Sequence, residues 1–214
     1  MIERSVMRFT RRALVLLGLL AAPLLMQSQA AHAATPAEAW AAENVQRGLS
    51  ILNKKQSRDA RRVEFRNFLL GLIDIDRVAL YTLGAGRRTA TPDEQKAFVE
   101  AFKDYAEAVY ESRLTQYSGQ TLKIIGSSAG KPGETVVRTV LIDPNNPSAN
   151  TDPLEVDFRI TQANGRFQVL DASVGGIWLA ILEHDDFDSF LAQNNGSVTK
   201  LVNHLHTLTR DLQR

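Results

Sequence analysis

A few polar residues in this 214-residue chain have the types and spacing that metal binding or catalysis needs. His184 stands beside Asp185 and Asp186, all of them metal-ligand types. Consecutive residues on a helix point in different directions, however, and an acidic run is more often a solvated surface. His204 and His206 lie about 200° apart on a helix, so they cannot hold one ion together. We therefore predict no metal site.

Asp171 is the one acidic residue whose position suggests acid–base chemistry. It lies between apolar residues at the expected end of a strand, where burial would raise the pKa of its carboxyl group. Tyr105 or Tyr110 would be its partner in such a site. The alternative is a carboxylate bonded to backbone amides at a strand–helix junction. The sequence offers no other catalytic constellation, and we predict no catalytic residue and no cofactor.

The elements that position these residues begin with a long helix over 92–117. Phe98, Phe102, Tyr105 and Val109 recur at i, i+4, i+7 and i+11, which is one helical face. Further apolar residues widen that face to roughly half of the helix, against the ~100° stripe of an ordinary surface helix. Such a helix is either a core helix between two layers or the wall of an apolar cavity, and the pattern does not decide between them.

The rest of the chain predicts an α+β fold. Helices are expected near 35–55, 58–73, 76–83 and 177–191, with a break at 183–186, and over the last 17 residues. Strands are expected over 121–126, 134–143 and 154–160, with Asn164-Gly165 as a hairpin turn before a return strand at 167–169. We predict an antiparallel sheet of about four strands, covered by helices from both ends of the chain and enclosing an apolar pocket.

Residues 1–33 have the features of an export leader. Four arginines precede the apolar run 13–26, and Ala31-His32-Ala33 fits a small-x-small cleavage pattern. We expect a cleaved signal peptide at 1–33, export to the periplasm, and a single domain at 34–214. The domain would carry 21 basic and 23 acidic side chains, which leaves no basic footprint for nucleic acid. The chain has no cysteine, so disulfides and thiol catalysis are excluded.

Several short motifs, in order along the chain, resemble the MlaC, or toluene-tolerance, family of periplasmic lipid carriers. The likeness is closest to the hopanoid-associated HpnM branch. The matching residues are Ile75-Asp76-Arg77-Val78-Ala79, Leu83-Gly84, Arg88, Ala90-Thr91-Pro92, Gln95, Phe98, Phe102, Tyr110, Leu114, Tyr117, Gly119, Val136-Val137-Arg138-Thr139, Phe158, Phe167, Asp171, Gly176, Leu179 and Phe187. The resemblance covers nearly all of the expected mature domain.

The resemblance implies a shuttle that binds lipid tails in a deep apolar pocket and does no chemistry. Its implied partners are a lipid ligand, an inner-membrane lipid transporter and, as a further candidate, an outer-membrane acceptor. The predicted lipid-binding wall comprises Ile75, Val78, Leu83, Phe98, Phe102, Tyr105, Val109, Val156, Phe158, Trp178 and Leu179. Arg87 and Arg88 are the predicted contacts for the head group or for a partner.

Three positions depart from the family pattern. Arg87 stands where the family commonly has Trp, Trp178 where it often has Ser, and His184 where it often has Arg. A large ring at Trp178 would suit a rigid, ring-shaped lipid such as a hopanoid better than two flexible acyl chains. We hold hopanoid and phospholipid as the two candidate ligands. An enzyme with a buried carboxylate in a cone-shaped pocket, and a non-binding envelope adaptor, are the alternative functions.

Overall fold

The computed structural model describes residues 33–114, 117–163 and 165–214. Contacts divide the chain into two compact units, Met1–Ala33 and Ala34–Arg214. The predicted export leader falls in the first unit, and all but one of its residues lie outside the described part of the chain. No helix in the described part is both long and apolar enough to cross a membrane.

The second unit has mixed helix and antiparallel sheet, as predicted. Its helices and strands follow one another as α1 (Pro36–Asn53), α2 (Arg58–Leu72), α3 (Ile75–Thr82), α4 (Gly86–Thr89), α5 (Pro92–Leu114), β1 (Thr121–Ala129), β2 (Glu134–Ile142), the 3-10 helix η1 (Pro147–Thr151), β3 (Glu155–Ala163), β4 (Arg166–Val174), β5 (Ile177–Trp178), α6 (Leu179–Gln193) and α7 (Val198–Leu212).

Capping boxes fix where the two longest helices begin. Ahead of α1, the Thr35 hydroxyl accepts from the Glu38 backbone N–H at 3.2 Å, and Glu38 Oε2 accepts from the Thr35 N–H at 3.1 Å. Thr91 and Glu94 repeat both bonds at the start of α5, at 3.2 and 3.0 Å. Each box satisfies two backbone donors that the first turn of a helix leaves free. Both helix starts expected from the sequence are therefore confirmed.

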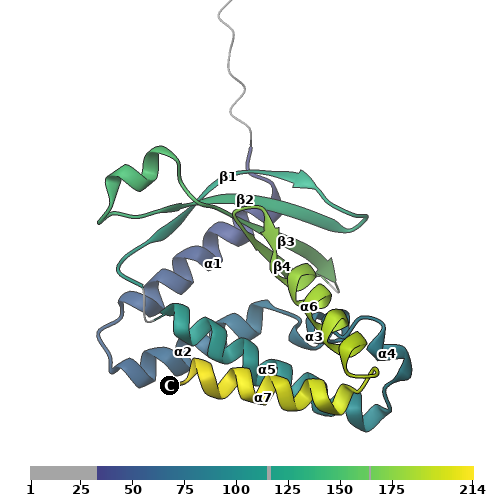
Figure 1. Ribbon diagram of the computed structural model, residues 1–214. Helices are drawn as coiled ribbons and strands as arrows, with labels where there is room; N and C mark the ends of the chain where they lie inside the picture. The colour runs from purple at the N-terminus through teal and green to yellow at the C-terminus, as the bar shows by residue number, and fades with distance from the viewer. Residues whose placement is uncertain (1–32, 115–116, 164) are drawn as a thin grey trace, which may run out of the picture. The chain divides into compact units, whose positions relative to one another are not determined.

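The five strands form one antiparallel meander in the order β1-β2-β3-β4-β5. Ala163 pairs with Arg166 across the predicted hairpin, where Gly165 has a φ of 75° and Asn164 lies outside the described residues. Residues of α1 pack on one face of the sheet, in a small core that includes Ala37, Val137 and Ile160. Figure 1 shows α1 running along the sheet before the chain turns into α2.

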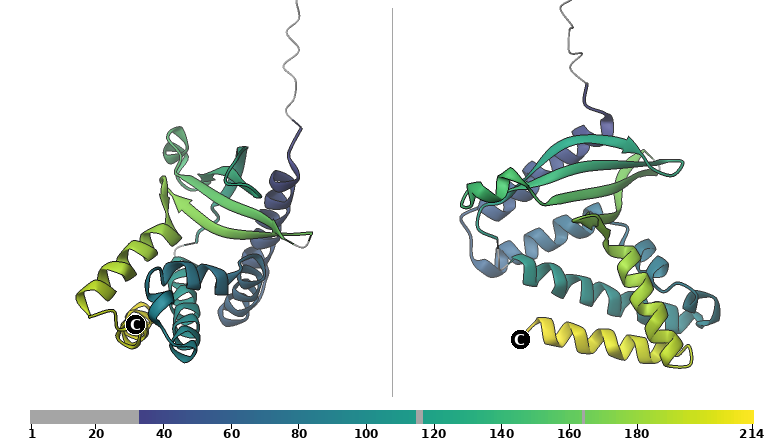
Figure 2. Two further views of the ribbon diagram at one scale, coloured as in Figure 1. Left: turned by 90° about the vertical axis from the view of Figure 1, so that its right-hand side faces the viewer. Right: turned by 45° about the horizontal axis from the view of Figure 1, so that its top comes forward.

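A separate helical core explains the wide apolar face of α5. Phe98, fully buried, lies with Phe102 against Phe187 of α6, with ring centroids 5.8 and 6.3 Å away. The rest of this core comes from α3, α5, α6 and α7. Figure 2 shows α7 beside α5 and apart from α1. The N-terminal half of α5 is therefore a core helix covered on more than one side, whereas Tyr110 farther along it faces Phe65 of α2.

Some local predictions were wrong. Ile177 and Trp178 form β5 with Val174 and Ser173, so α6 begins at Leu179. The expected break at 183–186 is absent from α6, because Asp185 and Asp186 are exposed while Glu183 is half-buried on the inner side. Two short helices were not among the predicted elements: α4, which begins at Gly86, and η1, which lies between β2 and β3.

The helical core predicts a large cost for shortening Phe98. Phe98→Ala should lower the free energy of unfolding by about 3–5 kcal/mol, because the cavity left among rigid neighbours does not close. Phe68→Ala on α2 removes the same atoms from a half-buried site and should cost about 1–2 kcal/mol. Urea unfolding followed by circular dichroism measures both, and equal losses would contradict a solid core at Phe98.

Candidate functional site

An apolar pocket of about 270 Å³ lies between α1, α2 and one face of the sheet. The residues that line it are Trp40, Ala41, Asn44, Val45, Gly48, Leu49 and Leu52 from α1, Phe65, Phe68, Leu69 and Leu72 from α2, Leu122, Leu141, Phe158, Ile160, Val169 and Thr121 from the sheet, and Tyr117 and Gln120 from the connection after α5. None of the described residues in this lining has an acidic or a basic side chain.

The sequence makes this hollow through two helices whose apolar stripes face each other. Val45, Leu49 and Leu52 recur at i, i+4 and i+7 on α1, and α2 contributes a matching stripe. Gly48 brings the helices close together, since a Cβ at that position would lie 3.1 Å from Cε1 of Phe68. No residue of α2 is fully buried, so this helix closes the pocket without being packed into a core.

The polar groups of the pocket are mostly engaged with their own neighbours. The Asn44 amide donates to the Trp40 carbonyl at 2.8 Å, and the Gln120 amide bonds to Ser118 and Asp143. The Tyr117 hydroxyl is the exception: it is shielded from solvent and has no hydrogen-bond partner among the described residues. Among the described residues, the pocket therefore presents a mostly apolar surface with one unpartnered hydroxyl, that of Tyr117.

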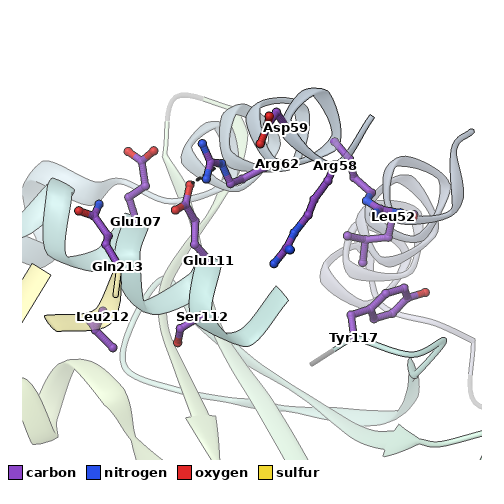
Figure 3. A pocket seen from close by; sticks show the side chains of 11 residues that line it. Leu52, Arg58, Asp59, Arg62, Glu107, Glu111, Ser112, Tyr117, Leu212 and Gln213 are labelled. Carbon is purple, nitrogen blue, oxygen red and sulfur yellow. Dashed lines mark hydrogen bonds and ion pairs between the residues drawn. The ribbon is translucent and has the colours of Figure 1, made fainter. Parts of the chain in front are cut away.

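A charged cleft of about 660 Å³ adjoins the apolar pocket (Figure 3). Leu52 and Tyr117 line both spaces, so the two meet at these residues. The other lining residues are Arg58, Asp59, Arg61, Arg62, Glu107, Glu111, Ser112, Leu212 and Gln213. The two hollows are therefore neighbours, one apolar and the other charged.

Two ion pairs join α2 to α5 beside the cleft. Arg62 Nε lies 3.2 Å from Glu111 Oε1, and Arg66 Nη1 lies 2.6 Å from Glu107 Oε1. Figure 3 shows Arg62 of α2 facing Glu111 of α5 across the top of the cleft. All four side chains are partly exposed, so each pair contributes up to about 1 kcal/mol to stability.

The predicted wall residues fall mostly outside this pocket. Phe158 is the member of the predicted set that lines it. Leu83, Phe98 and Phe102 belong to the helical core, and Ile75, Val78 and Tyr105 pack against that core. Val109 and Val156 are half-buried, and Leu179 is exposed. Lipid contact by this set stays a prediction.

Arg87 and Arg88, the predicted head-group or partner contacts, lie on the surface of α4. Both are exposed, and neither lines the pocket or the cleft. Sequence reasoning did not single out the stripes of α1 and α2 as pocket walls. One signal in the sequence was available: α2 combines an apolar stripe with many arginines. That combination is unusual for a helix that is packed into a core.

Trp178 does not face the pocket. Its ring lies under the guanidinium of Arg159, 4.2 Å from Cζ to the ring centroid. Arg159 also lies within 3.5 Å of Asp171 and 3.8 Å of Glu134. The ring that the sequence suggested as a wall for a rigid lipid is therefore part of a cation–π contact on the sheet.

Asp171 makes the hydrogen bonds to backbone amides that were predicted as the alternative to an acid–base role. Its Oδ1 accepts from the backbone N–H groups of Ala172 at 2.8 Å and Ala180 at 2.9 Å, so it caps the start of α6. Burial raises the pKa of its carboxyl group, although these bonds and Arg159 act in the opposite direction. The hydroxyl of Tyr105 donates instead to Glu183 at 3.0 Å.

The histidine cluster likewise makes local contacts. His184 lies 3.1 Å from Asp185 and 3.7 Å from Asp188, and its ring lies 5.4 Å from that of Tyr81 on α3. Asp188 also accepts from the Ala85 N–H at 3.3 Å, which ties the turn after α3 to α6. No group of three or more metal-ligand side chains in the described part of the chain could hold a metal ion.

Comparison with known proteins finds a matching family model and solved structures with a similar fold. A family model described as "MlaC protein" matches residues 42–207. The fold is similar to that of a phospholipid-binding protein from Ralstonia solanacearum, solved in complex with a phospholipid. The two chains share 21% identity at a TM-score of 0.70, over 84% of this chain and 100% of the other. At this identity the likeness establishes the fold.

The cap at Asp171 predicts a pH-dependent stability. The pKa of this carboxyl group is raised by burial, so the folded chain takes up its proton at a higher pH than the unfolded chain. Between those two pKa values the folded state binds more protons, and stability falls as pH rises. The free energy of unfolding of the wild type, relative to Asp171→Asn, should therefore increase as pH is lowered from 7 toward 4. Urea titrations across that range measure the difference, and a decrease would contradict the assignment.

Proposed function

The chain belongs to the MlaC protein family, and from that premise we propose that it is a carrier that binds a lipid by its hydrocarbon tails and does no chemistry on it. The observation that carries this proposal is the apolar pocket between α1, α2 and the sheet, where every lining residue that the structure describes is uncharged. Ligand sites are usually apolar concavities with few polar groups, and this one fits that description.

Exposing the hydrocarbon tails of a lipid to water is unfavourable, so a carrier needs an apolar pocket that holds them. Each methylene exposed to water costs about 0.8 kcal/mol, so a sixteen-carbon tail costs roughly 13 kcal/mol. A protein that moves a lipid through water must replace most of that cost with apolar contact. The facing stripes of α1 and α2 and the inner sheet residues offer this contact, while the charged cleft leaves an exit toward solvent for a polar head.

The pocket must widen to admit such a ligand. Its volume of about 270 Å³ is slightly below the roughly 300–1,000 Å³ of typical ligand sites. The wall that can move is α2, because none of its residues is fully buried and exposed ion pairs hold it to α5. We propose that α2 moves outward on loading and that the structure corresponds to a closed form.

Among lipids, we propose a phospholipid as the ligand. The similar Ralstonia solanacearum protein was solved with a phospholipid. The sequence argument for a hopanoid rested on Trp178, whose ring is occupied by Arg159. Membership of the HpnM branch and a hopanoid ligand remain predictions that the same lipid analysis would test.

The wider role follows from the sequence and the family. The features of residues 1–33 support export to the periplasm, where a carrier would deliver lipid to an inner-membrane transporter and receive it from, or pass it to, an outer-membrane acceptor. The enzyme alternative is less well supported, because Asp171 caps a helix and does not meet Tyr105 or Tyr110. The adaptor alternative needs a filled interior, which the pocket argues against.

A charge placed in the pocket wall should abolish lipid retention. Leu69→Asp would put an unpaired carboxylate among apolar walls, a loss large enough to reduce bound lipid at least tenfold. Leu70→Asp is the matched control, since Leu70 is the next residue on α2, is 38% exposed and does not line the pocket. Both proteins would be purified from the native host, denatured and extracted, and the lipids quantified by mass spectrometry.

The comparison is interpretable only for folded proteins, so circular dichroism accompanies it. Folded Leu69→Asp with wild-type lipid content would refute the pocket as the tail site. Loss of lipid in both variants would show that charge anywhere on α2 is damaging, and would also count against this assignment.

Lipid should also protect α2 from hydrogen exchange. Because α2 has no fully buried residue, its amides should open readily in lipid-free protein and be stabilised when a ligand fills the space beneath it. Amides of α7, which is anchored by Leu201 and Leu205 in the helical core, should change little. Mass spectrometry of lipid-free and lipid-loaded protein tests this, and equal protection in both helices would contradict a moving α2.

A further inference from the structure

We propose that the charged cleft binds the phosphate of the lipid head group, with Arg58 as its main ligand, so that phosphate-bearing lipids are selected over lipids with an uncharged head. This inference rests on the proposed function, since it concerns the other end of the same ligand. The residues that carry it are on α2 and on the connection after α5, away from Arg87 and Arg88.

The apolar pocket and the charged cleft lie next to each other. Leu52 and Tyr117 line both the apolar pocket and the charged cleft. A lipid whose tails fill the pocket therefore has its head directed past these residues into the cleft. Glycerol ester oxygens would lie near the junction, where the Tyr117 hydroxyl is shielded and without a partner among the described residues. Such an oxygen would accept the hydrogen bond that Tyr117 lacks.

The arginines around the cleft differ in whether their guanidinium groups already have a partner. Arg62 is paired with Glu111 and Arg66 with Glu107, and Arg61 donates to the Leu52 carbonyl at 3.2 Å. In the described part of the chain, the Arg58 guanidinium has no hydrogen-bond or ion-pair partner. Figure 3 shows Arg58 extending from α2 into the cleft, between Glu111 and Tyr117.

A phosphate in the cleft would meet both carboxylates and guanidinium groups. Glu107 and Glu111 would repel an anion, but Arg66 and Arg62 neutralise them. The carboxylate of Asp59 stands apart from the Arg58 guanidinium in Figure 3. Among the described residues that line the cleft, taken together with Arg66, four arginines stand against three carboxylates, so one positive charge of this set is unmatched. A guanidinium fork fits phosphate oxygens in two parallel hydrogen bonds, which an uncharged head cannot accept as strongly.

The N-terminus of α2 adds to the positive electrostatic potential around Arg58. Arg58 is the first residue of a 15-residue helix whose N-cap is Ser57. The positive end of the helix dipole therefore lies at the base of the Arg58 side chain, where it favours an anion. The helix end supports the assignment, and the unpaired Arg58 guanidinium in a cleft that adjoins the tail pocket is what carries it.

The test is a competition among lipids that differ only in the head. Lipid-free protein would be mixed with vesicles containing phosphatidylglycerol, phosphatidylcholine and diacylglycerol at equal mole fractions and with identical acyl chains. The vesicles are then removed, and the lipid bound to the protein is measured by mass spectrometry. We expect the wild type to take the two phosphate-bearing lipids in preference to diacylglycerol. In Arg58→Gln that preference should fall roughly tenfold, and Arg58→Lys should keep part of it.

Three variants serve as controls. Arg77→Gln removes an exposed arginine on α3 that lines neither space, and should keep the wild-type preference. Arg87→Gln and Arg88→Gln test the contacts predicted from sequence and should also keep it. Because Arg58 is exposed, the variant should fold as the wild type does, which circular dichroism checks.

Each other outcome overturns the inference. An unchanged preference in Arg58→Gln, or a loss in Arg87→Gln or Arg88→Gln, would place head-group recognition elsewhere. Uptake of diacylglycerol as readily as phospholipid by the wild type would leave the carrier function standing and remove the phosphate site. If the wild type takes no lipid at all, the carrier function fails. Titration with inorganic phosphate would then reassign the cleft to a free anion if binding depends on Arg58.

Discussion

The removal of apolar side chains from water is the constraint on which this fold depends, and it is met in two different ways. Around Phe98, side chains from α3, α5, α6 and α7 fill the space themselves. Between α1, α2 and the sheet, similar side chains leave about 270 Å³ unfilled. Packed interiors are dense, so a space of this size lined by leucine and phenylalanine is a feature to be explained by a guest.

The helices differ in whether they belong to a packed core or line the pocket. The helical core and the α1–sheet core consist of buried side chains packed against one another, and we expect them to keep their shape when the pocket is filled. Of the helices longer than five residues in the described part of the chain, α2 is the one that contributes to neither core, and its apolar stripe lines the pocket. A carrier needs one wall that can yield and others that cannot, and the burial pattern is consistent with α2 as the wall that yields.

Sequence patterns predicted the elements well, because their signals are local. The boxes at Thr35 and Thr91, the alternation in β3 and the Asn164-Gly165 turn each depend on neighbours a few residues away. The pocket could not be located in the same way. Periodicity shows that Phe98 and Phe102 share an apolar face, but what covers that face is Phe187, 85 or more residues along the chain. The same limit applies to Trp178, whose partner Arg159 is on another strand.

The bonds that hold α2 to α5 are suited to a helix that must move. Closing the pocket with apolar contacts would cost about 25 cal/mol for each Å² exposed again on opening, which accumulates quickly over a helix face. The pairs of Arg62 with Glu111 and Arg66 with Glu107 are partly exposed, so water replaces much of what is lost when they separate. They set the position of α2 in the closed form and oppose its opening weakly. Opening also separates Phe65 of α2 from Tyr110 of α5, whose ring centroids lie 6.3 Å apart, so this apolar contact sets most of the cost of moving the wall.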